Sequence, residues 1–273
     1  METSGIKKAG DVLGEILDER EYECEKHGKY TGRPIFLKWM NREMNPSCPL
    51  CDEEAAEHQA IEEERLAEEQ RRKADAAAEQ KRIAWLTELN IGKRLWNETF
   101  ETFDAYTDEL RHHLEVCADF ARNPQGRKLV MLGKNGTGKN HLAASVLKVT
   151  GGVVRKAYEV MLMLHQSYSG DTKEYDVILA LCETEMLVID EIGRTKGGQW
   201  EENWLSYVID KRHEDLLPMI LISNKHLKED CPTGGCPDCL QNWVGNDILS
   251  RIIEDGLIME FTGEDYRMKK RYQ

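Results

Sequence analysis

A short glycine-rich segment that ends in a lysine, residues 133–139, carries the clearest chemistry in the sequence. It lies between an apolar run, residues 129–132, and a stretch with helical character, residues 141–147, so we expect a strand, a loop and a helix in that order. Glycines let backbone N–H groups curl around phosphate oxygens, and Lys139 would neutralise the β- and γ-phosphates. The sequence therefore predicts a nucleotide phosphate site. Its expected contacts are Gly133, Lys134, Asn135, Gly136, Thr137, Gly138, Lys139, Asn140 and His141.

The residue after the lysine departs from the general pattern of such loops. Serine or threonine usually stands there and places a hydroxyl on Mg²⁺, whereas this chain has Asn140. An amide oxygen is also a ligand for a hard cation, so Asn140 is a candidate magnesium ligand. The alternative is a glycine-rich turn that binds nothing, and the complete strand, loop and helix context disfavours it.

An apolar run that ends in two acidic residues supplies the second half of the expected site. Residues 186–189 are all apolar, and Asp190 and Glu191 follow directly. Asp190 would hold Mg²⁺ directly or through water, and Glu191 would polarise the water that attacks the γ-phosphate. The spacing from the glycine loop predicts that the two strands lie side by side in the sheet.

Two further polar residues fit a site that hydrolyses ATP. Asn224 closes an apolar run, residues 219–223, and a carboxamide at a strand end can orient the attacking water. Arg251 lies on an expected helix and could reach the phosphates bound by a neighbouring subunit. The plain alternatives are a turn residue and a surface arginine. Combined with Lys139, Asp190 and Glu191, the two residues favour an ATPase.

Six of the eight cysteines fall into two tight clusters, which is more typical of metal ligands than of disulfide bonds. The first combines Cys-x-x-His with Cys-x-x-Cys and predicts a closed, structural zinc site. The second has three cysteines and a nearby histidine, and it is either a second zinc site or a reduced loop. The lone Cys117 and Cys182 are expected to be buried. The candidate ligands are Cys24, His27, Cys48 and Cys51 in the first cluster and His226, Cys231, Cys236 and Cys239 in the second.

Three stretches of different composition organise the chain. Residues 1–52 contain the first cysteine cluster and are expected to form a zinc module that docks a partner. Residues 53–96 are rich in strong helix formers with few apolar side chains, which predicts a charged helical linker. Residues 97–273 alternate apolar runs with helical stretches, which predicts an α/β domain with a five-stranded parallel sheet. The expected strands are residues 128–132, 152–157, 186–189, 218–223 and 257–261, and the expected helices are residues 138–149, 158–168, 175–183, 200–213 and 246–254.

Composition and charge limit the classes of function. The chain has 273 residues, of which 32% are charged, and its formal net charge is -13. Binding to nucleic acid by electrostatics alone is therefore not expected. No stretch approaches the roughly 18 consecutive apolar residues of a membrane span. We expect a cytoplasmic protein with no membrane partner.

These motifs together resemble the DnaC/IstB group of AAA+ ATPases, and most of all the bacterial and phage DnaC-like replicative helicase loaders. The resemblance covers roughly residues 90–262 and is carried by Asn140 with His141, residues 187–193, the strand that ends at Asn224 and residues 248–251. It implies that Asn224 is sensor 1 and Arg251 an arginine finger. Few residues follow the last expected strand, so the AAA+ P-loop core is expected to lack a helical lid and its second sensor arginine. The basic run 267–271 is expected to be a solvated tail.

The resemblance also implies partners and activity. In such loaders the nucleotide controls assembly on single-stranded DNA and grip on a hexameric replicative helicase, with self-association through the ATP sites and slow, assembly-coupled hydrolysis. ATP, Mg²⁺ and Zn²⁺ are the expected cofactors. The loop after the acidic pair is where these loaders are thought to touch single-stranded DNA, which makes Arg194, Lys196 and Trp200 candidates. Trp200 is alternatively a helix-packing residue.

Three other functions are compatible with parts of the pattern. An IstB-like transposition helper ATPase shares the core but remodels a DNA-bound transposase. A nucleotide-binding adaptor would keep the site with vestigial hydrolysis. A P-loop phosphotransferase would need an acceptor pocket and a lid, and Asp190, Glu191, Asn224 and Arg251 argue against it.

Overall fold

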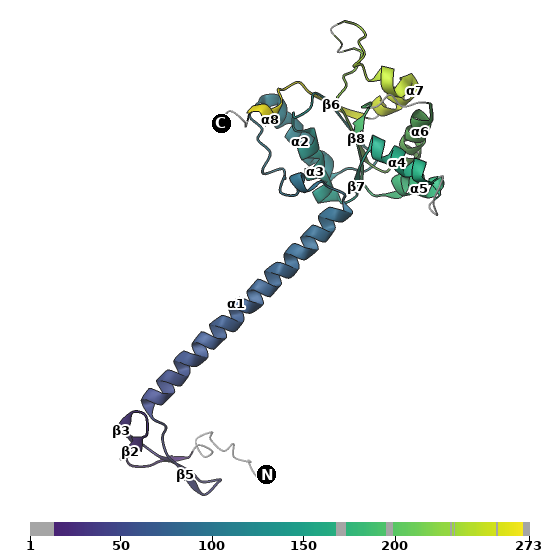
Figure 1. Ribbon diagram of the computed structural model, residues 1–273. Helices are drawn as coiled ribbons and strands as arrows, with labels where there is room; N and C mark the ends of the chain where they lie inside the picture. The colour runs from purple at the N-terminus through teal and green to yellow at the C-terminus, as the bar shows by residue number, and fades with distance from the viewer. Residues whose placement is uncertain are drawn as a thin grey trace, which may run out of the picture. The chain divides into compact units, whose positions relative to one another are not determined.

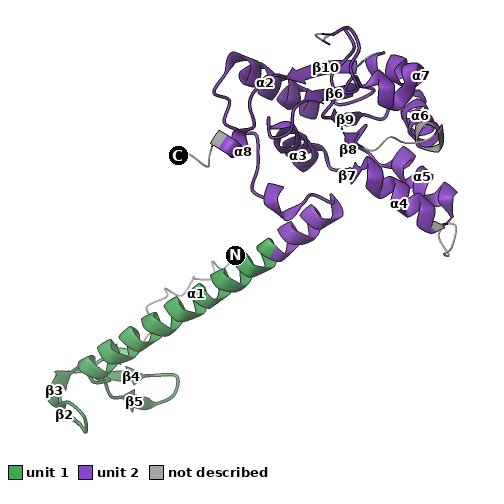
Figure 2. Cartoon of the chain, turned by 45° about the horizontal axis from the view of Figure 1, so that its top comes forward, with its two compact units in different colours: residues 1–79 green, residues 80–273 purple. Residues whose placement is uncertain are grey.

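The computed structural model divides the chain into two compact units, whose elements are labelled in Figure 1. Unit 1 is Met1–Glu79 and unit 2 is Gln80–Gln273, coloured green and purple in Figure 2. None of the helices in the described residues is long and apolar enough to cross a membrane. The structure describes residues 14–167, 173–194, 199–229, 231, 233–254 and 256–269, without the side chains of residues 167, 199–202 and 269.

Unit 1 begins with short antiparallel strands that bury very little. Among its described residues only Pro34 and Cys48 are buried, and Trp39 is 71% exposed. A segment of this size cannot build a sufficient apolar core, so it needs another source of stability. The strands are β1 (Glu15–Ile16), β4 (Ile35–Leu37) and β5 (Arg42–Met44) in one sheet and β2 (Arg20–Cys24) and β3 (Gly28–Gly32) in a hairpin.

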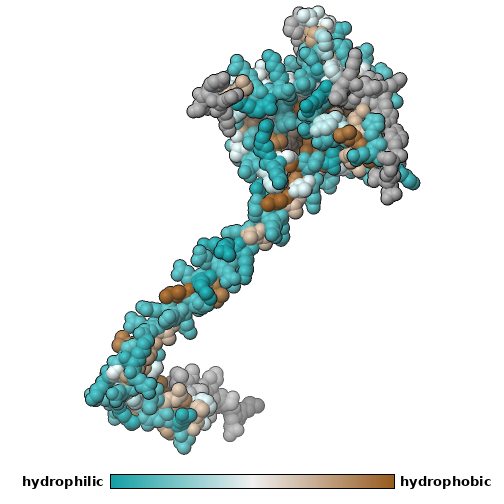
Figure 3. Space-filling view, in the orientation of Figure 1, coloured by the Kyte–Doolittle hydropathy of each residue, from teal (hydrophilic) through white to brown (hydrophobic). Residues whose placement is uncertain are grey.

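A helix of 40 residues, α1 (Pro49–Glu88), contains the boundary between the two units. Its proline stands at the first helical position, where a missing N–H has no cost. Ion pairs one turn apart, such as Glu69 with Lys73 at 2.7 Å, add a few tenths of a kcal/mol each. Figure 3 shows a largely hydrophilic helix surface with isolated apolar patches. The first buried side chain on the helix is Leu86, near its end.

The core of unit 2 is a parallel sheet of five strands, in the order β10-β6-β9-β8-β7. The prediction of an α/β fold with a five-stranded parallel sheet is therefore confirmed. Successive side chains of each strand enter opposite apolar layers, as period-2 alternation requires. The strands are β6 (Lys128–Gly133), β7 (Val153–Lys156), β8 (Leu187–Ile192), β9 (Met219–Ser223) and β10 (Gly256–Phe261).

The order of the strands corrects one expectation. The strand of the phosphate loop, β6, and the strand of the acidic pair, β8, are not neighbours, because β9 pairs with both and separates them. Strand order is decided by how the crossover helices pack on the two faces, and the spacing of motifs along the chain contains no such information. Because β9 lies between β6 and β8, its last residue, Ser223, and the following Asn224 lie between the phosphate loop and the acidic pair.

Helices cover both faces of the sheet, as Figure 1 shows. α2 and α3 contribute to one apolar cluster, and α4 to α7 contribute to the other. The lone Cys117 and Cys182 are buried in these clusters, as predicted. The helix α2 was absent from the expected set, although Thr107 caps it by accepting the N–H of Leu110 at 3.1 Å. The helices are α2 (Asp108–Arg122), α3 (Lys139–Thr150), α4 (Ala157–Ser167), α5 (Glu174–Glu183), α6 (Gln199–Glu214), α7 (Gln241–Ile253) and α8 (Tyr266–Lys269), with a 3-10 turn at Lys93–Leu95.

Candidate functional site

The phosphate loop joins β6 to α3 through three glycines in the left-handed region of φ. Gly133, Gly136 and Gly138 have φ of 119°, 79° and 102°. A Cβ at Gly133 would overlap the carbonyl of Phe261, and one at Gly136 would overlap the carboxylate of Asp265. Positive φ disfavours a side chain at all three positions, and the backbone carbonyl of Phe261 also excludes one at Gly133. The loop backbone thereby forms a concave turn at the N-terminus of a helix, which fits a phosphate group.

Lys139 begins α3 and is nearly fully buried beneath the loop. Its Nζ donates to the carbonyls of Gly133 and Lys134, both at 2.6 Å, and lies 3.3 Å from Thr137 Oγ1. Desolvation lowers the pKa of Lys139 to about 8, although the nearby Asp190 partly opposes this effect. An ammonium group that has already lost its water is stabilised strongly by an anionic partner. The Lys139 side chain therefore fits a polyphosphate.

The end of β8 forms a polar cluster with the start of α3. Asn140 Nδ2 donates to Asp190 Oδ2 at 2.7 Å, and the backbone N–H of Glu191 donates to Asp190 Oδ1 at 2.7 Å. Burial raises the pKa of Asp190 above its ordinary value, despite these two hydrogen bonds. Carboxylate oxygens are hard donors, so Asp190 fits a magnesium ion, and Asn140 is held beside it through its amide nitrogen.

Glu191 is held in a constrained position beside this cluster. Its φ of 62° lies in the left-handed region, which is unusual for a glutamate and is characteristic of functional sites. Arg194 Nη1 lies 2.6 Å from one carboxylate oxygen of Glu191, and Lys156 Nζ lies 3.6 Å from the other. Two cations thus hold the carboxylate that the sequence suggests as general base.

The end of β9 lies between the loop and the acidic pair. Ser223 Oγ donates to the carbonyl of Ile192 at 2.7 Å and accepts the N–H of Lys225 at 3.2 Å, which locks this end to β8. Asn224 follows and lines the same cavity as Lys139. Arg251 does not line that cavity: it lies on α7, about half exposed, and pairs with Asp210 of α6.

The cavity at this end of the sheet has a volume of about 750 Å³. Two of its aromatic walls, Tyr106 and Tyr266, stack at 6.2 Å between ring centroids. A cavity of this size with convergent polar groups and an aromatic wall fits a nucleotide. Its polar lining from the predicted site comprises Asn135, Gly136, Thr137, Gly138, Lys139, Asn140, His141, Asp190, Glu191 and Asn224.

The C-terminal helix α8 supplies residues that the sequence reasoning missed. The backbone N–H of Tyr266 donates to the carbonyl of Gly136 at 2.9 Å, which fastens α8 to the phosphate loop. Arg267 lines the cavity and is held by Asp265 through two hydrogen bonds of 2.8 and 2.9 Å. Arg267 and Met268 are exposed, as the expectation of a solvated tail requires, but Arg267 also lines the cavity. The residue pattern of a short charged segment does not indicate whether that segment packs against another part of the fold.

His141 anchors a preceding segment to the start of α3. Its Nε2 donates to the carbonyl of Thr99 at 2.7 Å, and its Nδ1 lies 3.0 Å from Glu98 Oε2. Phe103 packs edge-on against the imidazole at 5.1 Å. This residue therefore orders the wall of the cavity.

The three candidates for single-stranded DNA are described only in part. Arg194 contacts Glu191 and lies 6.0 Å from the ring centroid of Tyr158. Lys196 lies outside the described residues. Trp200 lies in the first turn of α6, and its side chain is outside the described residues.

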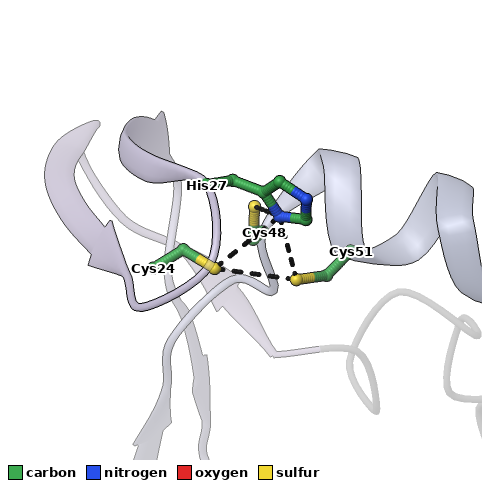
Figure 4. Close-up of side chains that lie close together, drawn as sticks. All are labelled: Cys24, His27, Cys48 and Cys51. Carbon is green, nitrogen blue, oxygen red and sulfur yellow. Dashed lines mark hydrogen bonds between the residues drawn. The ribbon is translucent and has the colours of Figure 1, made fainter.

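The first cysteine cluster brings four candidate ligands together in unit 1, as Figure 4 shows. The hairpin of β2 and β3 contributes Cys24 and His27, Cys48 directly precedes α1, and Cys51 lies in its first turn. The sulfurs of Cys24 and Cys51 are 3.6 Å apart, close to the roughly 3.8 Å that two Zn–S bonds of ~2.3 Å give in a tetrahedron. His27 Nε2 contacts Glu54 at 3.2 Å, an outer partner typical of zinc histidines. The donor set fits zinc.

The second cluster lies in unit 2, between β9 and α7. His226, Cys231, Cys236 and Cys239 place one ligand atom each within 4.8 Å of the others. This connection leads from Asn224 to the helix that carries Arg251.

Comparison with known proteins places the chain among ATP-binding proteins. The sequence model of the IstB-like ATP binding protein family matches residues 37–273. The replicative helicase loader DnaC of Escherichia coli is 22% identical over 182 residues, which cover 63% of this chain and 70% of the loader. The uncharacterized protein YdaV of E. coli is 29% identical over 141 residues, and the match spans only 53% of its length.

Solved structures show the same fold at low identity. A crystal structure of the DnaC helicase loader has a TM-score of 0.53 at 24% identity and covers 63% of this chain and 100% of its own. A crystal structure of DnaI has a TM-score of 0.52 at 16% identity, with 63% and 94% covered.

Proposed function

Because this chain belongs to the IstB-like ATP binding protein family, we propose that it is an ATPase that loads a hexameric replicative helicase onto single-stranded DNA. The observation that carries the proposal is that Lys139, Asp190, Glu191 and Asn224 line the same cavity. The similarity to sequences named replicative helicase loader supports the choice of partner.

The substrate ATP would lie with its phosphates on the loop N–H groups and Lys139. Mg²⁺, held by Asp190 and Asn140, would neutralise charge on the phosphate oxygens. Glu191 would accept a proton from water as the water oxygen attacks the γ-phosphorus, and Asn224 would orient that water. The bond between the γ-phosphorus and the bridging oxygen breaks, and ADP leaves. Arg267 would contact the phosphates from α8.

The contacts of Glu191 support the proposal that hydrolysis is slow. Its carboxylate is held by Arg194 and Lys156 and must be released from them before it can accept a proton from water. Assembly on DNA or helicase would supply that release. The proposed contacts for single-stranded DNA are Arg194, Lys196 and Trp200.

Self-association would complete the site. Arg251 is exposed on α7 and lies outside the cavity of its own chain, so it is available to the cavity of a neighbouring subunit. Its ion pair with Asp210 is a surface pair and costs at most about 1 kcal/mol to break. An arginine supplied in trans is worth several kcal/mol in the transition state.

The N-terminal segment would bind the helicase. We propose residues 1–52 as a docking module with zinc bound at Cys24, His27, Cys48 and Cys51, residues 53–96 as a charged helical linker and residues 97–273 as the ATPase domain. The exposed Trp39 and Met40 at the tip between β4 and β5 give this module an apolar contact surface. Tryptophan is typical of residues that dominate binding energy.

The test uses Glu191→Gln in the full chain, with the exposed Glu183→Gln as a matched control. We expect the first variant to retain ATP, lose hydrolysis and capture a hexameric replicative helicase in ATP, whereas the control behaves as wild type. ATP turnover and helicase capture on immobilised chain are measured together. Unchanged turnover in Glu191→Gln would favour an adaptor with vestigial hydrolysis.

A transposition helper is the second candidate, because the matching family is named for IstB. It predicts ATP-dependent recruitment to a transposase–DNA complex and no stable complex with helicase. Capture of helicase by wild type that is lost in Trp39→Ala would decide for the loader. Recruitment by transposase alone would decide against it.

A further inference from the structure

The connection between β9 and α7 contains the second group of metal-type ligands. We propose that His226, Cys231, Cys236 and Cys239 bind one Zn²⁺, and that this ion holds the end of β9 against the phosphate loop.

The distances among the ligand atoms match a tetrahedral zinc site. The sulfurs of Cys236 and Cys239 are 3.9 Å apart, against the roughly 3.8 Å expected for two thiolates on one zinc ion and the ~2.05 Å of a disulfide. His226 Nε2 lies 3.3 Å from Cys236 Sγ and 3.6 Å from Cys239 Sγ. A nitrogen and a sulfur on one zinc ion are expected at about 3.5 Å. With Cys231, the set closes a four-coordinate site, which is structural.

The backbone around the cysteines is already arranged for thiolates. The N–H of Asp238 donates to Cys236 Sγ, and the N–H of Cys236 donates to Cys239 Sγ, both at 3.3 Å. The tip of the loop, at Thr233, Gly234 and Gly235, is exposed. Such a loop has little apolar surface to bury, so a metal ion is the available source of its fold.

Lys225 connects this loop to the phosphate loop. Its carbonyl accepts the N–H of Gly133, the first residue of the phosphate loop, at 3.3 Å. Its Nζ lies 2.6 Å from Asp238 Oδ1, within the cysteine loop, and 4.1 Å from the ring centroid of Trp243 on α7. Trp243 in turn donates its indole N–H to the carbonyl of Pro237 at 2.7 Å. Asn224, which lines the nucleotide cavity, therefore lies between β9 and a segment that the ion would hold.

Metal content tests the site in the full chain. We expect two zinc ions per chain in wild type, one in the double variant Cys236→Ser with Cys239→Ser, and two in the matched loop control Glu229→Ala. A second double variant, Cys24→Ser with Cys51→Ser, identifies the ion of unit 1. Wild type with one zinc ion, all of it lost in this second variant, would overturn the proposal.

Nucleotide binding tests the role of the ion, and this part rests on the function proposed above. Loss of the second zinc should weaken the affinity for a fluorescent ATP analogue by at least about fivefold, the lower range of coupling between sites. If the variant that has lost the second zinc ion binds the ATP analogue as tightly as wild type does, the proposed role of the ion in nucleotide binding is refuted. No binding of the analogue by wild type refutes the nucleotide site instead, and the zinc count still decides the metal.

Hydrogen exchange tests the proposal without a variant, so the result does not depend on whether a cysteine variant folds. Wild type is compared before and after zinc is removed with a chelator. We expect faster exchange in residues 224–245 and unchanged exchange in β10. Unchanged exchange in residues 224–245 after loss of both ions contradicts the proposal.

Discussion

Replacement of Arg212 by methionine tests how the sheet that carries the site is held together. Arg212 lies on α6, its side chain is 0% exposed, and it donates only to backbone carbonyls. These carbonyls belong to the end of α5, the segment before β8 and the residue before β9, so one guanidinium joins three parts of the fold. The acceptors are Leu181, Cys182, Thr184, Glu185 and Pro218, at 2.9, 3.2, 2.7, 3.3 and 2.6 Å.

Two opposing effects set the size of the change. Burial lowers the pKa of Arg212 from 12.5 to about 10, so removal of the charge relieves about 3 kcal/mol of desolvation. Methionine leaves the acceptors without this donor, at about 1 to 3 kcal/mol for each buried group. Three of the five bonds are buried, and removing one partner of such a buried charged network costs more than the relief of desolvation returns, so we expect the free energy of unfolding of unit 2 to fall by about 3 kcal/mol. For a unit of this size that lowers Tm by about 6 to 12 °C.

The assay is urea and thermal unfolding of the full chain, analysed for the transition of unit 2. Lys211→Met is the matched control, since the adjacent Lys211 is partly exposed and makes surface ion pairs with Glu214 and Asp215. Its expected cost is below about 1 kcal/mol. If Arg212→Met were as stable as this control, the argument from unsatisfied carbonyls would be refuted.

Three further predictions concern the nucleotide cavity. Arg267→Ala should weaken binding of an ATP analogue about tenfold, the loss of one charge-assisted contact of about 1.5 kcal/mol; unchanged affinity in a fluorescence titration would remove Arg267 from the site. Burial lowers the pKa of Lys139 to about 8, and its protonated form binds phosphate, so the affinity for the ATP analogue should fall as pH rises through 8. Calorimetry near that pH should show proton uptake on binding. Constant affinity from pH 7 to 9 would contradict this prediction. Gly136→Ala places a Cβ on the carboxylate of Asp265 and should abolish nucleotide binding, whereas Gly126→Ala, also at positive φ but with its nearest contact at 3.4 Å, should cost about 1 kcal/mol of stability and retain nucleotide binding.

Features decided within a few residues could be predicted. The phosphate loop follows from glycines, which adopt positive φ with the least strain, and from a lysine at the first position of the helix that follows. The acidic pair and Asn224 follow from their place at the ends of apolar runs, because parallel strands of one sheet end at the same edge. The same holds for the four ligands in unit 1, whose paired spacing matches the reach of one ion.

Features that depend on distant packing could not be predicted. The helix α2 is an exception, because its N-terminal cap and its apolar face are both local features of the sequence that predict a helix. Arg267 differs, because a basic residue near a chain end has the same local pattern whether it is solvated or lines a cavity. Its place depends on the Tyr266 N–H, which bonds to Gly136.

The sequence by itself determined which chemical groups this protein brings to a phosphate and to metal ions, since those depend on residue type and short spacing. The tertiary structure alone decided their neighbours: β9 between β6 and β8, Glu191 between two cations, and Lys225 between the phosphate loop and the second cysteine cluster. The physical reason is that strand order and side-chain partners come from the packing of elements far apart in the chain, and local propensity contains no term for that packing.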